Sequence, residues 1–411
     1  MADVTEHTPA DAATPAAPLS PAAPSSPAPG PGGPAGPAAD WDPRAPRTLA
    51  ELDAVRSRCP VAHDAAGGWT LLAHADVAAA ARDAGTFSNA VSRHLQVPNG
   101  LDGAEHARFR AVVDRYFTPE RVAAAEPGVR AVAAALVAEL PVPGAVDAVD
   151  VGARFAVRAQ SVWLGWPAAL EDELLAWVAD NRAATRSRDR ARTAEVAARF
   201  DAIIRGLLAD RRGPGAPADV TTALVRDRVD GRALTDEEIV SVLRNWTGGD
   251  LGSMALCAGV VLTFLADHPD VQAHLRAGVP DRELDAVLDE ILRIDDPFLS
   301  NRRVATRGCP VGGREVAAGD TVVLHWTAAN RDPAVFGDPD AFDPERNAAQ
   351  NLVWGTGPHV CPGRPLATME LRALVRAVLA ATTAVDPDPE REREREVPPA
   401  GGYAVAPVRL R

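Results

Sequence analysis

The sequence predicts a mostly α-helical protein with small β-sheets, folded as a single large domain. Three observations support this fold class. Helical patterns run with few breaks from Ala104 to about Leu275, and a last helix is expected from about Pro365 to Ala381. Between them lies a β-hairpin pattern, with one strand at 303–307, a turn at Gly312-Gly313 and a second strand at 321–325. Hydrophobic residues make up 46% of the 411-residue chain, which is enough for a sizeable core.

The N-terminal part of the chain changes character near residue 45. Residues 1–45 consist mainly of alanine and proline, with glycine and serine. Because such a composition buries too little apolar surface to fold, we expect a disordered tail over 1–45 and one folded domain over 46–411. Within that domain, residues 69–72 are typical of a short strand, 75–84 of a helix, and 88–103, which lack a period, of a loop.

Charge and cysteine content exclude several classes of protein. The net charge of −13 argues against nucleic acid as a partner, and the absence of lysine makes every positive charge an arginine. The four cysteines form neither a C-x-x-C pair nor a zinc-like cluster, so we expect no disulfide scaffold and a cytoplasmic location.

The N-terminus lacks a signal-peptide pattern, and the longest apolar run is interrupted by glycines and charge. We therefore expect no membrane span.

A long helix is predicted in the second half of the chain. Residues 235–238 (Thr-Asp-Glu-Glu) form a capping box that opens a helix running to Asp267. Its middle holds Gly248, Gly249 and Gly252. Together, three interior glycines lower helix stability by roughly 3 kcal/mol relative to alanine. We therefore expect them to have a structural or functional reason. Either another helix packs very closely there, or the helix opens to admit a flat ligand and water.

Two polar residues lie in this glycine-rich stretch. Asp250 and Ser253 are three residues apart and therefore share a helix face. A carboxylate and a hydroxyl beside an opened helix could relay protons, which makes both residues candidate catalytic groups. The alternative for Ser253 is that its hydroxyl bonds to a backbone carbonyl within the helix.

A second amphipathic helix is expected over residues 281–295. Its apolar stripe is formed by Leu284, Val287, Leu288, Ile291 and Leu292. Glu290 and Arg293 lie one turn apart on this helix. Taken alone, they predict an ordinary surface ion pair that contributes little stability.

Cys361 is the most informative residue of the chain. It lies in a glycine-rich segment, residues 354–363, directly before the last predicted helix. Unpaired N–H groups and the positive dipole end of that helix stabilise a thiolate, and the glycines let the backbone approach a large flat partner. The alternative is a small buried cysteine in a glycine-rich turn.

These segments, in this order, resemble the cytochrome P-450 family of haem-thiolate enzymes. The family's cysteine loop, F-G-x-G-x-H-x-C-x-G, is matched by W-G-T-G-P-H-V-C-P-G at 354–363, except for Trp354. The family's E-x-x-R motif is matched by Glu290 and Arg293. A histidine and an arginine four apart are matched by His106 and Arg110, and the arginine of the strand after E-x-x-R is matched by Arg303. The resemblance covers residues 50–411.

The resemblance implies a cofactor and the residues that hold it. Cys361 would be the axial ligand of a haem b iron, and the cysteine loop would lie beneath the haem with the long helix over its distal face. Glu290 and Arg293 would form a structural network behind the haem. The propionates would be bound by four residues: His106, Arg110, Arg303 and His359. The substrate pocket would be lined by residues 88–100, helices between 170 and 205, and residues 246–249 and 297–302, with Trp246, Phe298 and Leu299 as apolar walls.

The resemblance also implies an activity and its partners. The protein would be a soluble, monomeric monooxygenase of bacterial secondary metabolism that inserts oxygen into a small organic substrate. Because no flavin or iron–sulfur domain is visible in the sequence, its electrons would come from a separate ferredoxin and ferredoxin reductase.

The chain departs from the family's distal pattern, A/G-G-x-D/E-T. That pattern falls on residues 249–253, where Ser253 takes the threonine place, Gly252 the acid place and Asp250 a glycine place. Asp250 could replace the missing acid through water, or the substrate could supply its own polar group. A third hypothesis is a peroxide-driven oxidation, a coupling or a rearrangement. A haem- or ligand-binding protein without catalysis is the alternative of another class.

Overall fold

Helix α9 (Asp236–Asp267) is the longest element of the structure, a computed structural model that describes residues 42, 48–64 and 67–411. It begins with the predicted capping box, in which Thr235 and Glu238 each accept a backbone N–H of the other. The mostly α fold with small sheets is confirmed. The disordered tail predicted over 1–45 lies outside the described residues apart from Asp42, so this boundary stays a prediction.

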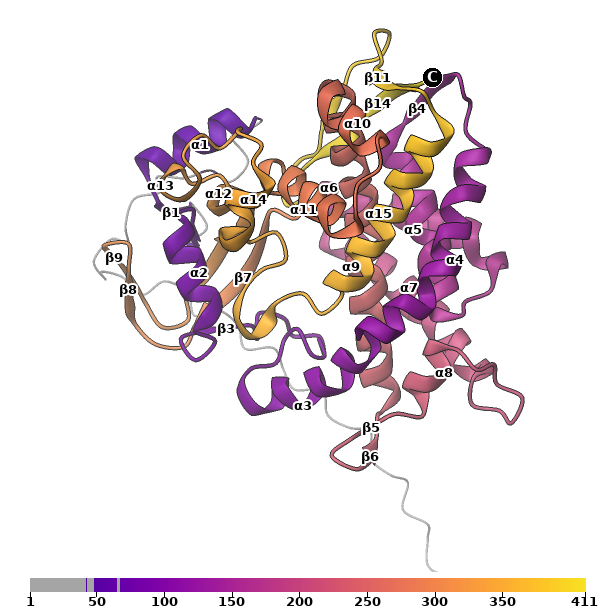
Figure 1. The fold of residues 1–411 in the computed structure, drawn as a ribbon. Coiled ribbons are helices and arrows are strands. Elements are labelled where there is room, and N and C mark those ends of the chain that lie inside the picture. Colours follow the sequence, from indigo (N-terminus) through magenta and orange to yellow (C-terminus); the bar gives the residue numbers. More distant parts are fainter. Residues whose placement is uncertain (1–41, 43–47, 65–66) are drawn as a thin grey trace, which may run out of the picture. The chain divides into compact units, whose positions relative to one another are not determined.

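Several helices pack against α9 (Figure 1). They are α5 (Ala148–Leu164), α6 (Glu171–Ser187), α7 (Arg190–Asp210), α10 (Pro269–Arg276), α11 (Asp281–Ile294) and α15 (Arg364–Ala381). The other helices before α9 are α1 (Leu49–Arg58), α2 (His74–Arg82), α3 (Gly103–Val113), α4 (Pro119–Ala138) and α8 (Val220–Val225). The other helices after it are α12 (Trp326–Asn330), α13 (Pro333–Phe336) and α14 (Pro344–Asn347).

Helix α9 is a core helix although its composition would suit a membrane. Among the described residues it is the one helix long and apolar enough to cross a bilayer, yet 67% of its most apolar window is buried inside the protein. The glycines and charges in this run led to the expectation that no apolar helix reaches the length of a span, and on length that expectation was wrong. Burial by neighbouring helices, rather than interruption, explains the run.

The closest packing between α5 and α9 occurs at small residues. A Cβ added to Gly152 would lie 2.6 Å from the Cβ of Ala258, and one added to Gly259 would lie 2.7 Å from Val149 Cγ2. Real Cβ atoms do not approach so closely, so these glycines let the two helices touch.

The main sheet has five strands in the order β1-β2-β10-β7-β3. They are β1 (Val61–His63), β2 (Trp69–Leu71), β3 (Phe87–Ser88), β7 (Ser300–Ala305) and β10 (Thr321–His325). Strands β2 and β10 are parallel, and the other neighbours are antiparallel. The predicted pairing of the segment around 303–307 with 321–325 is present, with Arg303 opposite Val322.

The turn of that hairpin differs from the prediction. Gly312 and Gly313 connect β8 (Cys309–Val311) to β9 (Arg314–Val316), a separate two-stranded sheet inserted between β7 and β10. Both glycines have positive φ, 53° and 78°, which suits glycine in a tight turn.

The predicted helical stretch 104–275 also contains strands. They are β4 (Gly144–Asp147), β5 (Arg228–Val229) and β6 (Arg232–Ala233). The C-terminal strands are β11 (Val385–Pro387), β12 (Glu394–Arg395), β13 (Tyr403–Val405) and β14 (Pro407–Leu410). Strand β14 pairs with both β4 and β11, so the partner that makes β4 a strand comes from the far end of the chain.

Candidate functional site

The cysteine loop is held in one conformation by short contacts. The backbone N–H of Cys361 donates to the carbonyl of Trp354 at 2.9 Å, and the indole N–H of Trp354 donates to Asp289 at 2.7 Å. Gly357 has φ +78°, and a Cβ there would lie 2.6 Å from the carbonyl oxygen of Ala81 in α2. This glycine therefore serves the packing of the loop on α2, whereas Gly363 adjoins the sulfur, with its Cβ position 3.8 Å from Cys361 Sγ.

Cys361 lies at the start of α15, as predicted. Burial raises the pKa of its thiol, and the backbone N–H groups of Gly363 and Arg364 act in the opposite direction. The helix start therefore favours the thiolate, but burial has the larger effect. A thiolate at this position needs a further positive partner, such as a metal ion.

The middle of α9 faces open space. A Cβ added to Gly248, Gly249 or Gly252 would meet no atom within 4 Å. This observation decides between the two explanations of these glycines. Close helix packing occurs further along the helix, at Gly259, while the stretch 248–252 leaves room for a ligand.

Asp250 and Ser253 have separate surroundings. The Ser253 hydroxyl donates to the carbonyl of Gly249 within the helix, which is the alternative that the sequence analysis left open. The Oδ2 atom of Asp250 is buried and has no hydrogen-bond partner among the described residues. In the described part of the chain no hydrogen bond joins Asp250 to Ser253. The two residues share a helix face by their spacing, but their side chains are not hydrogen-bonded to each other.

A second buried carboxyl group lies near Asp250. Burial raises the pKa of Asp250 to about 7 and, together with the charge of Asp250, raises the pKa of Glu370 on α15 well above its usual range. Gln160 of α5 acts in the opposite direction on both groups. The sequence analysis missed Gln160 and Glu370. A glutamate on the apolar face of α15, next to the buried Met369, was the signal for the second.

Three of the predicted propionate partners lie together. The rings of His106 (α3) and His359 are in tilted contact with centroids 3.9 Å apart, and each buried Nε2 lacks a hydrogen-bond partner among the residues described. The Nε2 of His359 lies 3.4 Å from an oxygen of Asp102, beyond the range of a good hydrogen bond.

Arg303 completes this group. Its side chain is buried and donates to the neighbouring carbonyl of Arg302 at 2.8 Å, and in the described chain no carboxylate lies within ion-pair distance of it. Burial lowers its pKa to about 10. A buried guanidinium and two partnerless imidazole nitrogens suit a pair of carboxylates, so these residues fit the haem that the resemblance implies.

The fourth predicted partner, Arg110, has other contacts here. Its Nε donates to Asp114 at 2.9 Å, and its Nη1 donates to the carbonyls of Pro358 (3.1 Å) and Val360 (2.9 Å). Arg110 therefore ties α3 to the cysteine loop on either side of His359.

Glu290 and Arg293 form a buried network. Their side chains are 2% and 0% exposed, and the guanidinium makes two hydrogen bonds to the carboxylate, at 2.8 and 2.9 Å. Arg293 also donates to three backbone carbonyls, and Glu290 accepts from Asn347 and from the N–H of Asp343. Spacing alone indicated a surface pair, and that interpretation was wrong, because α12 to α14 cover this turn of α11.

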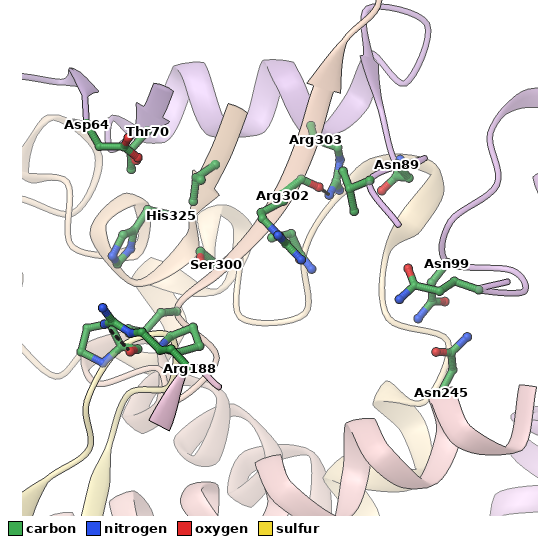
Figure 2. Close-up of a pocket in the computed structure, with 17 residues that line it drawn as sticks. Asp64, Thr70, Asn89, Asn99, Arg188, Asn245, Ser300, Arg302, Arg303 and His325 are labelled. Atoms are coloured by element: carbon green, nitrogen blue, oxygen red, sulfur yellow. Dashed lines mark hydrogen bonds between the residues drawn. The ribbon is translucent and has the colours of Figure 1, made fainter. Parts of the chain in front are cut away.

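A cavity of about 580 Å³ adjoins Arg303 (Figure 2). Its lining comes from the 89–99 loop, from Asn245 of α9, from β7 and from β10. Leu299 lines the cavity as predicted, whereas Trp246 packs against Tyr116, Phe117 and Trp163 in the core. Phe298 is 48% exposed.

Comparisons with known proteins agree with this geometry. A sequence model of the cytochrome P450 family matches residues 185–400. The chain is 33% identical to the erythromycin C-12 hydroxylase of Saccharopolyspora erythraea over 354 residues, covering 80% of this chain and 85% of that enzyme. It is also 33% identical to the cyclomarin C epoxidase CymV of Salinispora arenicola, covering 74% and 80%.

Solved structures are similar as well. The open form of cytochrome P450 EryK from S. erythraea aligns with a TM-score of 0.80 and 29% identity over 88% of this chain and 95% of that one. The himastatin-pathway hydroxylase HmtN aligns with a TM-score of 0.75 and 28% identity over 88% and 96%. The fold and the resemblance predicted from the sequence are thereby confirmed. The chain belongs to the cytochrome P450 family and is a monooxygenase-type oxidoreductase.

Proposed function

We propose that this protein hydroxylates or otherwise oxidises a small organic substrate in bacterial secondary metabolism, with Cys361 as the iron ligand of a haem b. The observation that carries this proposal is the pairing of a fixed cysteine loop with the partnerless Nε2 atoms of His106 and His359 and with the buried guanidinium of Arg303, which has no carboxylate partner among the described residues. The names of its relatives support a complex natural product as substrate, since they include a macrolide hydroxylase and the epoxidase of cyclomarin C.

Each residue around the haem would have its own role in binding. Cys361 would supply the thiolate, while His106, His359 and Arg303 would bind the propionates. Arg110 stays a predicted propionate partner. Its Nε donates to Asp114 and its Nη1 to two loop carbonyls, so Nη2 would be the atom left for a propionate. When bound, the haem supplies the oxygen-activating chemistry, which thiolate ligation favours.

Proton handling would begin at Ser253. Its hydroxyl, bonded to the Gly249 carbonyl, would hold the proton nearest the open stretch of α9. The carboxyl of Asp250 is turned into the buried group with Gln160 and Glu370, so Asp250 would reach the distal side only through water. Electrons would come from a separate ferredoxin and ferredoxin reductase, in a cytoplasmic, monomeric enzyme.

One observation favours a second candidate. Gly252 stands where the family has an acid, and its Cβ position is empty. Without that acid, a peroxide-driven oxidation, a coupling or a rearrangement is the alternative activity, and a non-catalytic haem- or ligand-binding protein is the alternative of another class.

The experiment starts with the reduced, carbon-monoxide-treated protein. A red-shifted, thiolate-type Soret band is expected in the wild type and not in Cys361→Ala; the same band in both proteins would overturn the haem-thiolate assignment. Turnover with ferredoxin, reductase and NADPH is then compared with turnover on peroxide alone. Activity on peroxide only would favour the second candidate, and ligand-induced spectral shifts without turnover would favour a binding protein.

A further inference from the structure

We propose that the substrate carries a carboxylate and that Arg302 binds it in the cavity beside the haem site. This inference rests on the proposed function, because it names the substrate class of the same site. It starts from the strand that places Arg302.

Strand β7 sends its two consecutive arginines to opposite sides. Side chains alternate along a strand, so Arg303 is buried beside His106 and His359, while Arg302 points into the cavity (Figure 2). Both arginines line the cavity, but Arg303 is buried while Arg302 is exposed. Arg303 would therefore bind a haem propionate, and Arg302 faces the space left for another molecule.

The guanidinium of Arg302 has no partner in the described part of the chain. No ion pair or side-chain hydrogen bond is formed by it, although the chain carries 56 acidic residues against 43 basic ones. The two other arginines that line the cavity, Arg303 and Arg188, likewise form no ion pair with a described residue, but each donates to a backbone carbonyl. Elsewhere in the protein, Arg331 pairs with Asp53 and Asp340, and Arg395 pairs with Asp295. Arg302 is exposed at the cavity and has no such partner, so it is available to a ligand.

The other polar groups of the cavity leave that role to Arg302. Gln96 and Asn99 also line the cavity, and their side-chain amides have no hydrogen-bond partner among the described residues. Arg188 reaches the carbonyl of Pro398 at 3.4 Å. Asp64, which is the cavity's carboxylate, accepts the N–H of Gly68 at 3.1 Å and lies well apart from Arg302 in Figure 2.

The energetics favour an anionic ligand over a neutral one. Ligand pockets are mostly apolar with a few polar groups that fix orientation. A ligand that covered Arg302 without an acceptor would leave a desolvated guanidinium unpaired, which is costly. A carboxylate matches the two-pronged donor geometry of arginine and restores the lost hydrogen bonds. Amides such as Gln96 and Asn99 can donate to the same group or to carbonyls beside it.

The test uses the haem-loaded full-length protein and probe molecules that bind the haem iron through an imidazole group. Imidazole binds haem iron whatever the natural substrate is, so we would titrate ω-(imidazol-1-yl)alkanoic acids of increasing chain length, their methyl esters and the plain 1-alkylimidazoles. Binding is followed by the Soret shift and by calorimetry. We expect one chain length at which the acid binds about tenfold or more tighter than the ester, as for a charge-assisted hydrogen bond.

Two variants assign that preference. In Arg302→Gln the acid and the ester should bind equally, while the ester's affinity and the haem content stay at the wild-type level. Arg282→Gln is the matched control, because Arg282 is exposed on α11, outside the cavity, and should keep the full preference.

Three results would overturn the inference. The first is that the acid and the ester bind the wild type with equal affinity at every chain length. Loss of haem from Arg302→Gln is the second, because Arg302 would then serve a haem propionate rather than a substrate. The third is the lack of a spectral shift with any imidazole, which would overturn the proposed function together with this inference.

Discussion

The imidazole rings of His106 and His359 are in tilted contact, with their centroids 3.9 Å apart and an interplanar angle of 37°. One ring belongs to helix α3 and the other to the cysteine loop, and Arg110 joins these segments through the carbonyls of Pro358 and Val360. Burial lowers the pKa of both histidines, that of His359 to about 4. Two neutral imidazoles are thus pressed together with their Nε2 atoms unsatisfied, an arrangement that a bound anionic group would relieve.

Replacement of His106 by phenylalanine tests this relationship. The introduced phenyl ring would keep the ring contact with His359 but remove the unsatisfied nitrogen. His106→Phe should therefore fold and release haem about tenfold faster, the effect of one charge-assisted hydrogen bond. Transfer of haem to excess apomyoglobin measures the rate. His274→Gln, at an exposed site on α10, should leave the rate unchanged. An unchanged rate in His106→Phe would remove this residue from the haem-binding set.

Replacing Gly252 and Gly259 of α9 by alanine, one at a time, should change the stability of the protein in opposite directions. In Gly252→Ala the added Cβ enters open space, so the haem-free protein should gain up to about 1 kcal/mol of unfolding free energy from helix propensity. In Gly259→Ala the Cβ would lie 2.7 Å from Val149 Cγ2. Overpacking there should cost about 1–3 kcal/mol. Denaturant unfolding measures both, and a loss of stability in Gly252→Ala would contradict the open stretch.

The buried Glu290–Arg293 pair should matter far more than an exposed one. Arg293→Met leaves the Glu290 carboxylate buried with a lost partner, which should cost about 3–5 kcal/mol in the free energy of unfolding. The control is Arg108→Met, whose pair with Asp230 is 51% and 56% exposed. That substitution should change stability by less than about 1 kcal/mol. Similar losses in the two variants would show that the network contributes no more than a surface pair.

The carboxyl of Asp250 should make stability fall as pH rises. Burial raises its pKa in the folded protein from the ordinary 3.8 to about 7, so the folded chain holds this proton more tightly than the unfolded chain does. The stabilisation from this bound proton is complete at pH values below the pKa that Asp250 has in the unfolded chain. It is lost as the pH rises through the pKa that Asp250 has in the folded protein. Asp250→Asn removes this titration, so the variant should be roughly 1–3 kcal/mol more stable than the wild type at pH 8.

At pH 5 the advantage of Asp250→Asn should shrink, since most of the wild-type carboxyl is then protonated. Denaturant unfolding at both pH values provides the comparison, with Asp230→Asn as an exposed control. A difference that stays constant with pH would mean that Asp250 is ionised throughout. Glu370→Gln should show a related pattern, and the double variant should deviate from additivity because the two carboxyls interact.

Local patterns alone predicted a large part of the fold. The capping box at Thr235, the apolar stripe of α11 and the helix after Cys361 are sequence-local features, and each element begins and ends within a residue or two of its predicted bounds. Strand β4 was missed because its reason to be a strand is β14, which lies at the other end of the chain.

The family motifs of this protein could be identified from its residues alone: Cys361 in its glycine loop, the Glu290–Arg293 spacing, and the histidines and arginines expected at the haem. These depend on residue identity and short spacing, which the chain carries directly. The tertiary structure decided what surrounds each group. It showed that Gly252 faces space while Gly259 packs on Val149, and that Asp250 belongs with Gln160 and Glu370. Burial, and the neighbours that cause it, come from segments far apart in sequence, and burial sets the pKa of a carboxyl or the strength of an ion pair.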